Sequence, residues 1–157
     1  MLKEMKQKPF IMIGAASSGS GKTTFTLGLL RLLRNRGMKV QPFKCGPDYI
    51  DSMFHSRVLG IETGNLDSFF TDDQTLRALL AGRQADIHVI EGVMGYYDGM
   101  GFTENGSASE IAALTKTPVI LTINARGMSR SVLAVLRGFL ESQSWPGIKG
   151  VIFTQLS

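Results

Sequence analysis

Residues 16–23 constrain the fold of this chain more than any other part of its sequence. Their letters, ASSGSGKT, match the phosphate-loop pattern G-x-x-x-x-G-K-[ST], with Ala16 in the place of the first glycine. A short apolar run at 10–14 precedes them, and an apolar period of 3.6 residues over 22–36 follows them. We therefore expect the loop to connect a strand to a helix, where backbone N–H groups and the helix N-terminus bind a polyphosphate.

Each residue type in this loop has a use in nucleotide binding. Lys22 is expected to reach the β- and γ-phosphates, and the Thr23 hydroxyl is expected to bind Mg²⁺. A structural turn before a helix is the alternative, but strand, glycines, lysine and hydroxyl occur here in the required order. The residues expected to bind the nucleotide are Ser18, Gly19, Ser20, Gly21, Lys22, Thr23 and Thr24.

The rest of the chain alternates between strand and helix patterns. Helices are expected over 22–36 and 72–81, after Ser107, and around the apolar positions of 132–140. The expected strands cover 10–14, 38–44, 87–91, 119–123 and 151–154. This alternation predicts an α/β fold of the P-loop NTPase type, with a doubly wound and mainly parallel sheet.

Local signals refine this prediction. Pro42 lacks an N–H donor, so the strand over 38–44 is expected to lie at a sheet edge or to end early. Residues 45–70 show no clean period and are predicted to be a long, functional connection without regular structure. Two capping boxes predict helix starts: Thr71 with Gln74, and Ser107 with Glu110.

Composition limits the class of protein. With 43% hydrophobic and 19% charged residues, the chain has enough apolar mass for one core and too little charge for disorder. It has no apolar run of about 18 residues and no signal-peptide pattern, so we expect one soluble, cytoplasmic domain. A single cysteine, Cys45, excludes an internal disulfide and a thiolate zinc site.

The net charge of +4 comes from scattered basic residues. A protein that reads nucleic acid would cluster them among aromatic side chains. We therefore expect no nucleic-acid or membrane partner, whereas an anionic small substrate fits this charge.

Acidic residues follow two of the predicted strands, at the edge where a doubly wound sheet binds its ligands. Glu91 ends the apolar run IHVIE, and Asp98 lies seven residues further on. Asp48 and Asp51 come directly after the strand over 38–44. Such carboxylates hold the metal in phosphoryl transfer, and Glu91 is the strongest candidate. For the other acids, a role in a turn or cap is the alternative.

Three further reactive side chains carry weaker signals. His88 lies inside a core strand, which favours a buried structural histidine. His55 lies in an irregular acidic loop, where a surface position and a contact to substrate are both open. Cys45 has no recognisable base partner and is expected to be a small buried residue instead of a nucleophile.

Four segments of the chain resemble one family: SSGSGKTT, FKCGPDYIDSMFH, IEGVMGYYDG and NARGMSRSV. They are similar to the ATP-binding domain of cobyrinate a,c-diamide synthase and of relatives that act on hydrogenobyrinate or nickel-sirohydrochlorin. GPDYID and EGVMGYYDG are more specific than the phosphate loop, which unrelated NTPases share. The resemblance covers nearly the whole chain and implies an ATP- and Mg²⁺-dependent amidoligase of cobalamin biosynthesis, with a fold like that of dethiobiotin synthetase.

The resemblance also implies a reaction and its residues. A substrate carboxylate would attack the γ-phosphate of ATP, and ammonia would then displace phosphate from the acyl phosphate. This would amidate the a and c carboxylates of an anionic tetrapyrrole such as cobyrinic acid. The implied catalytic residues are Lys22, Asp48, Tyr49, Asp51 and Asp98. The implied ligands of Mg²⁺ are Thr23, Asp48 and Glu91.

In this family a C-terminal glutamine amidotransferase-like domain supplies the ammonia by hydrolysing glutamine. Residues 1–157 match only the ATP-binding synthetase portion, so we expect a fragment of a longer protein in which that glutaminase domain is absent. Asn124 stands where the family usually has aspartate. Thr154 stands where an asparagine commonly follows the last strand, which bears on an expected adenine contact. The oligomeric state, including a homodimer, stays open.

The sequence leaves three alternative functions open. A ligase like dethiobiotin synthetase also phosphorylates a carboxylate group, although GPDYID argues against it. A ParA/MinD-like switch ATPase would carry a second lysine early in the loop, where this chain has Ser17. The third is an inactive fragment that binds nucleotide without catalysis.

Overall fold

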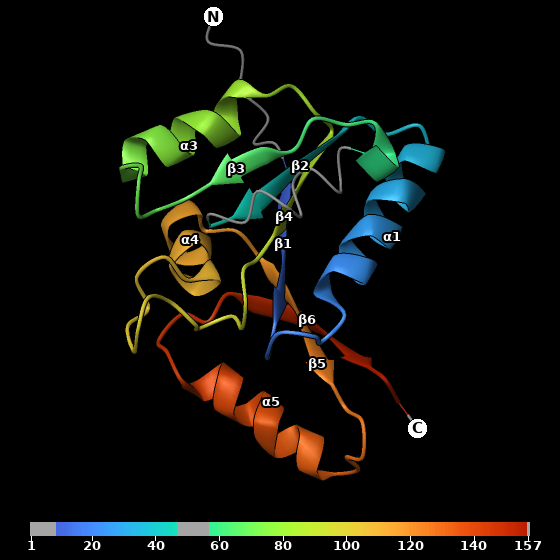
Figure 1. Cartoon of the computed structure of the whole chain (residues 1–157), viewed down its shortest axis with the longest axis vertical. Coiled ribbons are helices and arrows are strands. Elements are labelled where there is room, and N and C mark those ends of the chain that lie inside the picture. Colours follow the sequence, from blue (N-terminus) through green and yellow to red (C-terminus); the bar gives the residue numbers. More distant parts are fainter. Residues whose placement is uncertain (1–8, 47–56, 157) are drawn as a thin grey trace, which may run out of the picture.

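The computed structural model describes residues 9–46 and 57–156. Within them, six strands form one sheet in which every pair is parallel (Figure 1). The strands are ordered β3-β2-β4-β1-β5-β6 across it. They are β1 (Phe10–Ala15), β2 (Val40–Cys45), β3 (Gly64–Leu66), β4 (Ile87–Glu91), β5 (Val119–Asn124) and β6 (Ile148–Thr154). The helices are α1 (Lys22–Asn35), α3 (Asp73–Gly82), α4 (Ala108–Thr115) and α5 (Ser131–Glu141).

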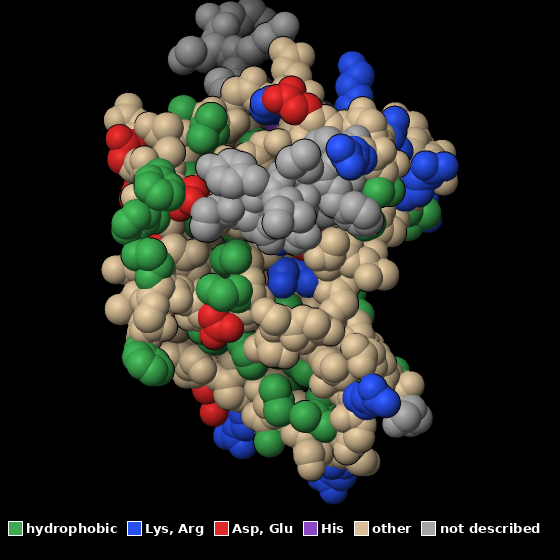
Figure 2. Space-filling model, in the orientation of Figure 1, with side chains coloured by type: hydrophobic (Ala, Val, Ile, Leu, Met, Phe, Trp, Pro, Cys, Tyr) green, Lys and Arg blue, Asp and Glu red, His purple; other side chains and the backbone are tan. Residues whose placement is uncertain are grey.

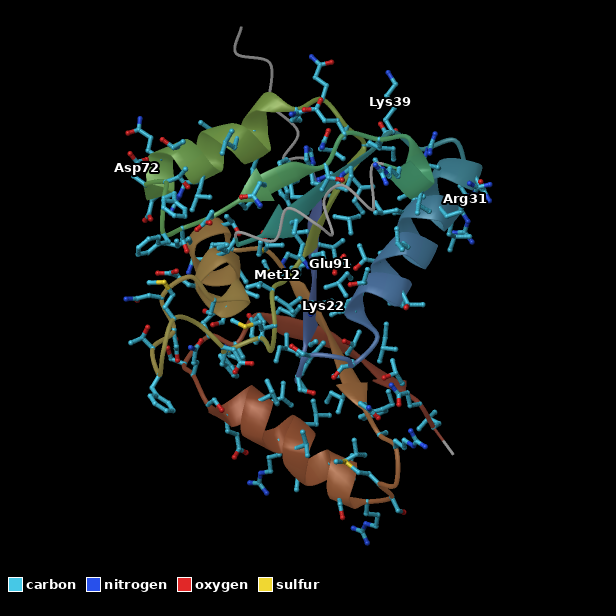
Figure 3. The ribbon with its side chains drawn as sticks, viewed as in Figure 1. Met12, Lys22, Arg31, Lys39, Asp72 and Glu91 are labelled. Atoms are coloured by element: carbon cyan, nitrogen blue, oxygen red, sulfur yellow. The ribbon has the colours of Figure 1, made fainter. Side chains whose placement is uncertain are left out.

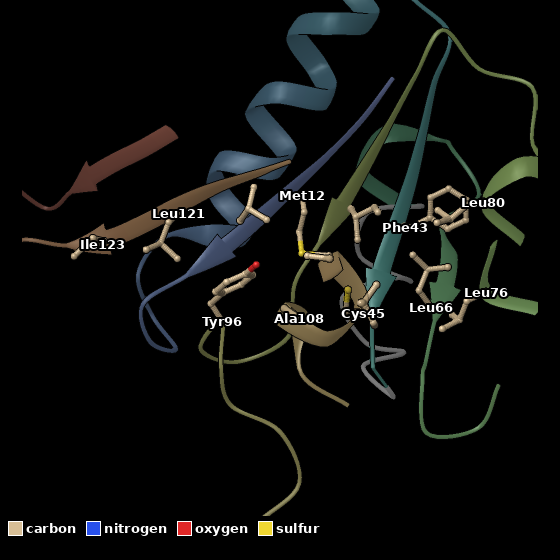
Figure 4. Close-up of a cluster of buried hydrophobic side chains, with 14 of the residues drawn as sticks. Met12, Phe43, Cys45, Leu66, Leu76, Leu80, Tyr96, Ala108, Leu121 and Ile123 are labelled. Carbon is tan, nitrogen blue, oxygen red and sulfur yellow. The ribbon is translucent and has the colours of Figure 1, made fainter. Parts of the chain in front are cut away.

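Helices cover both faces of the sheet, because alternate residues of a strand point to opposite sides. On one face, Met12 of β1 packs in a cluster that includes Leu76 of α3 and Ile111 of α4. On the other face, the neighbouring Ile13 packs in a second cluster with Leu30 of α1. Figure 4 shows the first cluster, which lies between the sheet and the helices α3 to α5. The predicted doubly wound α/β fold is confirmed.

Most predicted elements are present, with ends that differ by a few residues. The strand over 87–91 coincides with β4, and the strand over 10–14 extends by one residue in β1. The last strand begins earlier than the predicted 151, since β6 starts at Ile148. The apolar patterns were therefore sufficient to identify the buried strands.

Two predictions about the region around β2 are wrong. Residues 45–70 contain the strand β3, which pairs with β2 and forms an edge of the sheet. β2 is therefore not an edge strand, and it continues to Cys45. β3 pairs with β2 only from Phe43 onward, so Pro42 lies in a part of β2 that has a strand on one side only. The missing N–H of Pro42 is tolerated there.

The helix caps were predicted with mixed success. Ser107 is the N-cap of α4, and its side chain accepts a hydrogen bond from the Glu110 N–H, as predicted. The cap of α3 is Asp72, whose carboxylate accepts from the Thr75 N–H, and not Thr71. The Thr71 hydroxyl instead donates to the Asp67 carbonyl oxygen. Over the described residues, no helix combines the length and apolar character needed to cross a membrane.

Candidate functional site

The phosphate loop lies at the centre of the sheet edge where ligands of this fold bind. It follows β1, which lies between β4 and β5 in the sheet. All strands are parallel, so the carboxyl ends of β1, β4 and β2 meet at this edge. The segments that follow β1 and β4 therefore meet at one site, where Figure 3 labels Lys22 and Glu91.

The backbone of the loop is held by its neighbours. Gly19 and Gly21 have φ values of 77° and 82°, in the left-handed region that favours glycine. The Thr154 hydroxyl donates to the Ser20 carbonyl oxygen over 3.0 Å, and the Gln155 amide donates to the Gly19 carbonyl oxygen over 3.4 Å. Thr154 thus supports the loop from β6, and α1 begins with Gly21 as a cap that has no side chain. The first N–H groups of α1 are therefore directed into the loop, as an anion site requires.

Lys22 lies against the segment that follows β4. Its Nζ donates a hydrogen bond to the Met94 carbonyl oxygen over 3.0 Å, and the residue is only 9% exposed. Met94 has a φ of 42°, in the left-handed region that non-glycine residues rarely adopt. The ammonium group of Lys22 is thereby held beside the loop, close to where a polyphosphate would lie.

A buried polar network joins the loop to β4 and β2. The Thr23 hydroxyl donates to Glu91 Oε1 over 2.6 Å, and Lys44 Nζ forms an ion pair with the same oxygen over 3.1 Å. Glu91 is 0% exposed and Lys44 is 2% exposed. Lys44 and Glu91 are register partners on β2 and β4, which explains why their side chains meet.

The oxygen atoms of Thr23 and Glu91 are suited to Mg²⁺. A hydroxyl and a carboxylate are hard donors, and Mg²⁺ is bound in nucleotide sites by one or two such groups together with phosphate oxygens and water. Thr23 Oγ1 and Glu91 Oε1 are 2.6 Å apart, so one metal ion could contact both oxygens. Among the described residues, no group of three His, Cys, Asp or Glu side chains forms a metal cage, so the nucleotide phosphates would complete the coordination.

Glycines after β4 bring that segment close to the phosphate loop. The Gly92 N–H donates to the Ile13 carbonyl oxygen, and the Tyr96 N–H donates to the Ala15 carbonyl oxygen. Asp98 closes a turn with Gly95, because its Oδ2 accepts from the Gly95 N–H over 2.9 Å. A Cβ atom on Gly95 would collide with this carboxylate. Asp98 is thus held in the turn that directly follows Met94.

The structure brings together the predicted site residues Lys22, Thr23 and Glu91. Asp98 lies in the turn that follows Met94. The predicted residues Asp48, Tyr49 and Asp51 lie outside the described residues, as does His55.

Two other predictions from the sequence are confirmed. Cys45 is fully buried in the core, as expected, and burial raises the pKa of its thiol to about 12, which favours the protonated, unreactive form. His88 is a buried core residue whose Nε2 lies 3.2 Å from the Arg83 carbonyl oxygen. Its ring stacks on Phe43.

Two site residues were missed by reasoning from the sequence. Lys44 was assigned only to a strand, although a lysine at the carboxyl end of a strand, directly after the apolar residues Pro42 and Phe43, is a signal for a buried ion pair. Asp67 was interpreted only as a marker of a connection. It is 7% exposed and follows β3 directly, on the same edge of the sheet. An acid directly after a strand was the available signal, but that strand was not predicted.

Comparison with known proteins agrees with this geometry. The family model of the CobQ/CobB/MinD/ParA nucleotide binding domain matches residues 11–157. The chain is 49% identical over 151 residues to a cobyrinate a,c-diamide synthase of Listeria monocytogenes serotype 4b, covering 94% of this chain and 33% of that protein. It is 44% identical over 152 residues to a hydrogenobyrinate a,c-diamide synthase of Rhodobacter capsulatus, covering 94% and 35%. The chain thus spans about a third of the length of these curated relatives.

A solved structure with a similar fold is the signal recognition particle receptor FtsY of Elizabethkingia anophelis. The TM-score is 0.65 at 14% sequence identity, over 95% of this chain and 51% of that chain. At this identity the likeness concerns the fold alone. It agrees with the α/β architecture described above.

Proposed function

The chain belongs to the family of the CobQ/CobB/MinD/ParA nucleotide binding domain, and from this premise we propose that it is the ATP-binding synthetase domain of a cobyrinate a,c-diamide synthase. In this proposal it uses ATP and Mg²⁺ to amidate the a and c carboxylates of cobyrinic acid or a close tetrapyrrole, in the cytoplasm. The names of its relatives support the substrate class. Because the chain spans about a third of their length, we propose that a further glutaminase domain supplies the ammonia.

One observation carries the proposal: three groups suited to phosphoryl transfer meet at the phosphate loop. Lys22 is held by the Met94 carbonyl group, and Thr23 and Glu91 place a hydroxyl and a carboxylate oxygen 2.6 Å apart. Phosphoryl transfer depends mainly on alignment of the reactants and on neutralisation of charge at the γ-phosphate. The Thr23 hydroxyl and the Glu91 carboxylate beside the loop support a metal that accompanies the nucleotide, because both are hard oxygen donors.

The reaction begins with an oxygen of the substrate carboxylate, which attacks the γ-phosphorus of ATP. The bond from that phosphorus to the β-γ bridging oxygen breaks, and ADP leaves with the electron pair. Lys22 stabilises the charge on the phosphate oxygens, and the N–H groups at the start of α1 hold the polyphosphate in line. Bound Mg²⁺, held by Thr23 and Glu91 with Asp48 as a further ligand, would supply additional neutralisation of charge.

Ammonia completes the reaction. Its nitrogen attacks the carbonyl carbon of the acyl phosphate, the bond from carbon to the phosphate oxygen breaks, and a proton leaves the nitrogen. The products are an amide, phosphate and ADP. In this proposal Asp48, Tyr49, Asp51 and Asp98 act near the substrate, of which Asp98 is the one that lies within the described residues.

The test is turnover by the chain itself, with ammonium chloride in place of glutamine. ATP and Mg²⁺ are added with and without cobyrinic acid, and phosphate release is measured together with product mass. We expect phosphate release that depends on cobyrinic acid and a mass decrease of about one unit for each carboxylate amidated. Release that is indifferent to any tetrapyrrole would instead support a switch ATPase, a function consistent with the MinD and ParA members of the family.

A matched pair of lysine variants assigns the activity to the loop. Lys22→Ala should lower turnover at least about a hundredfold, because the charge beside the γ-phosphate is lost. Lys39→Ala removes an exposed lysine that lies away from Lys22 in Figure 3, and should leave turnover unchanged. Equal activity of the Lys22 variant and the parent chain would refute the assigned site.

A further inference from the structure

A second concave site lies beside the phosphate loop. Its walls are almost entirely apolar, and they come from the segments that follow β3 and β4 and from the loop before α4. The residues that line it include Asp67, Phe69, Phe70, Val93, Met94 and Met100. We call this the apolar pocket. Figure 2 shows hydrophobic side chains gathered on this side of the molecule, where α3 and α4 lie in Figure 1.

Large side chains of the apolar pocket are open to solvent. Phe70 is 73% exposed and Met100 is 50% exposed. The ring of Phe69 packs edge-on against that of Phe70, with 4.9 Å between the ring centroids. Several large apolar groups exposed around one hollow indicate a ligand site. A ligand with an apolar body would remove these groups from water.

The pocket is connected to the catalytic groups through Met94. The carbonyl oxygen of this residue accepts the hydrogen bond from Lys22 Nζ, and the same residue lines the pocket. At its other end the pocket reaches Asp67, directly after β3. β3 and β4 are separated by β2, so their carboxyl ends are about 10 Å apart. A ligand that contacts both ends of the pocket is therefore extended, as a macrocycle is.

Asp67 supplies a specific polar feature in this pocket. Its Oδ1 accepts from the Phe69 N–H over 3.0 Å, whereas its buried Oδ2 has no hydrogen-bond partner among the described residues. A buried acceptor without a donor costs free energy, so a ligand that donates there is favoured. A carboxylate of the ligand would be repelled by Asp67, and a primary amide would bind.

We propose that the apolar pocket binds one face of the tetrapyrrole and that Asp67 Oδ2 accepts an N–H bond from the amide made in the first amidation. The inference rests on the proposed function. An a,c-diamide requires two amidations, and the described residues hold one phosphate loop. The first amide must therefore lie away from Lys22 when the second carboxylate approaches, and Asp67 receives that amide while the macrocycle of the monoamide packs against Met94 and Phe70.

The test separates the two amidations. Cobyrinic acid and its monoamide are each used as substrate, with ATP, Mg²⁺ and ammonium chloride. Asp67→Asn should raise the KM for the monoamide about tenfold and change the KM for cobyrinic acid and for ATP less than twofold. When this variant reacts with cobyrinic acid to completion, the products should contain more monoamide and less diamide than those of the parent chain. Phe70→Ser should raise the KM for both tetrapyrroles and leave the KM for ATP unchanged.

Two controls keep the test decisive. Phe102→Ser removes a fully exposed phenylalanine that does not line the pocket, and it should behave like the parent chain. Asp67→Ser retains an acceptor for the Phe69 N–H and replaces Asp67→Asn if that variant unfolds. In Asp67→Asn, binding of the monoamide is measured by equilibrium dialysis without turnover. Its dissociation constant should rise by about the same factor as the KM for the monoamide.

The outcomes distinguish the two proposals. If the Asp67 and Phe70 variants bind and convert both tetrapyrroles like the parent chain, this inference is overturned while the proposed function stands. An equal rise in KM for both tetrapyrroles in Asp67→Asn overturns the role of Asp67 in holding the amide. If the parent chain neither binds nor converts a tetrapyrrole, the proposed function itself has failed.

Discussion

At the scale of single residues, Glu91 is the centre of the site. Its Oε1 receives both the Thr23 hydroxyl and the Lys44 ammonium group, and all three side chains belong to different elements. Lys44 keeps the buried carboxylate compensated, while Thr23 connects it to the phosphate loop. The ion pair thus positions the proposed metal ligand.

This arrangement predicts the effect of removing Lys44. Lys44→Met should lower the free energy of unfolding by about 3 kcal/mol, because a buried charge loses its counter-charge. Adding Glu91→Gln to the same chain should restore part of that loss. Urea denaturation of the single and double variants measures both effects. Additive losses would show that the two side chains are not coupled.

Cys45 provides a residue-scale prediction about pH. Burial raises the pKa of its thiol from 9.0 to about 12, so the folded protein keeps the proton through a range where the unfolded chain loses it. The contribution of this group to stability is therefore present below pH 9 and declines as the pH rises toward 12. A thiol reagent at pH 8 should label Cys45 only after unfolding in guanidinium. Complete labelling of the folded chain would refute this account.

At the scale of elements, α4 illustrates what local sequence determines. Ser107 caps the helix through a 3.1 Å bond from the Glu110 N–H, and the residue is fully buried. Ser107→Ala should lower the free energy of unfolding by about 1 kcal/mol. The exposed Ser144→Ala is the control and should leave it unchanged. Both are measured by urea denaturation, and equal stability of the two variants would mean that the cap contributes nothing.

Elements were predictable where their signal is local. The strand over 87–91 has a short apolar run and the helix that follows the phosphate loop has a clear 3.6-residue period, and both are present. β3 has only three residues, and it exists because it pairs with β2. Such a strand has no period of its own, so its position depends on contacts distant in sequence. The cap of α3 was misplaced by one residue because Thr71 and Asp72 are both good capping residues.

At the scale of the whole molecule, the topology assembles the site. Lys22 and Thr23 were predictable from the loop motif, and Glu91 from its place at a strand end. The roles of Lys44 and Asp67 depend on the order β3-β2-β4-β1, which places residues from separate segments on one edge. That order is set by packing of the sheet between its helices and carries no short-range pattern. The position of the apolar pocket beside the phosphate loop therefore could not be predicted from the sequence.

The central claim is that this chain transfers the γ-phosphate of ATP to a carboxylate of a tetrapyrrole. The most direct measurement uses cobyrinic acid with isotopically heavy oxygen in its carboxylates, together with ATP, Mg²⁺ and ammonium chloride, and determines the mass of the released phosphate. An acyl phosphate predicts one heavy oxygen atom in the phosphate for each amide formed, because the carbon–oxygen bond breaks when ammonia attacks. Amide formation with phosphate that carries only ordinary oxygen would contradict the account.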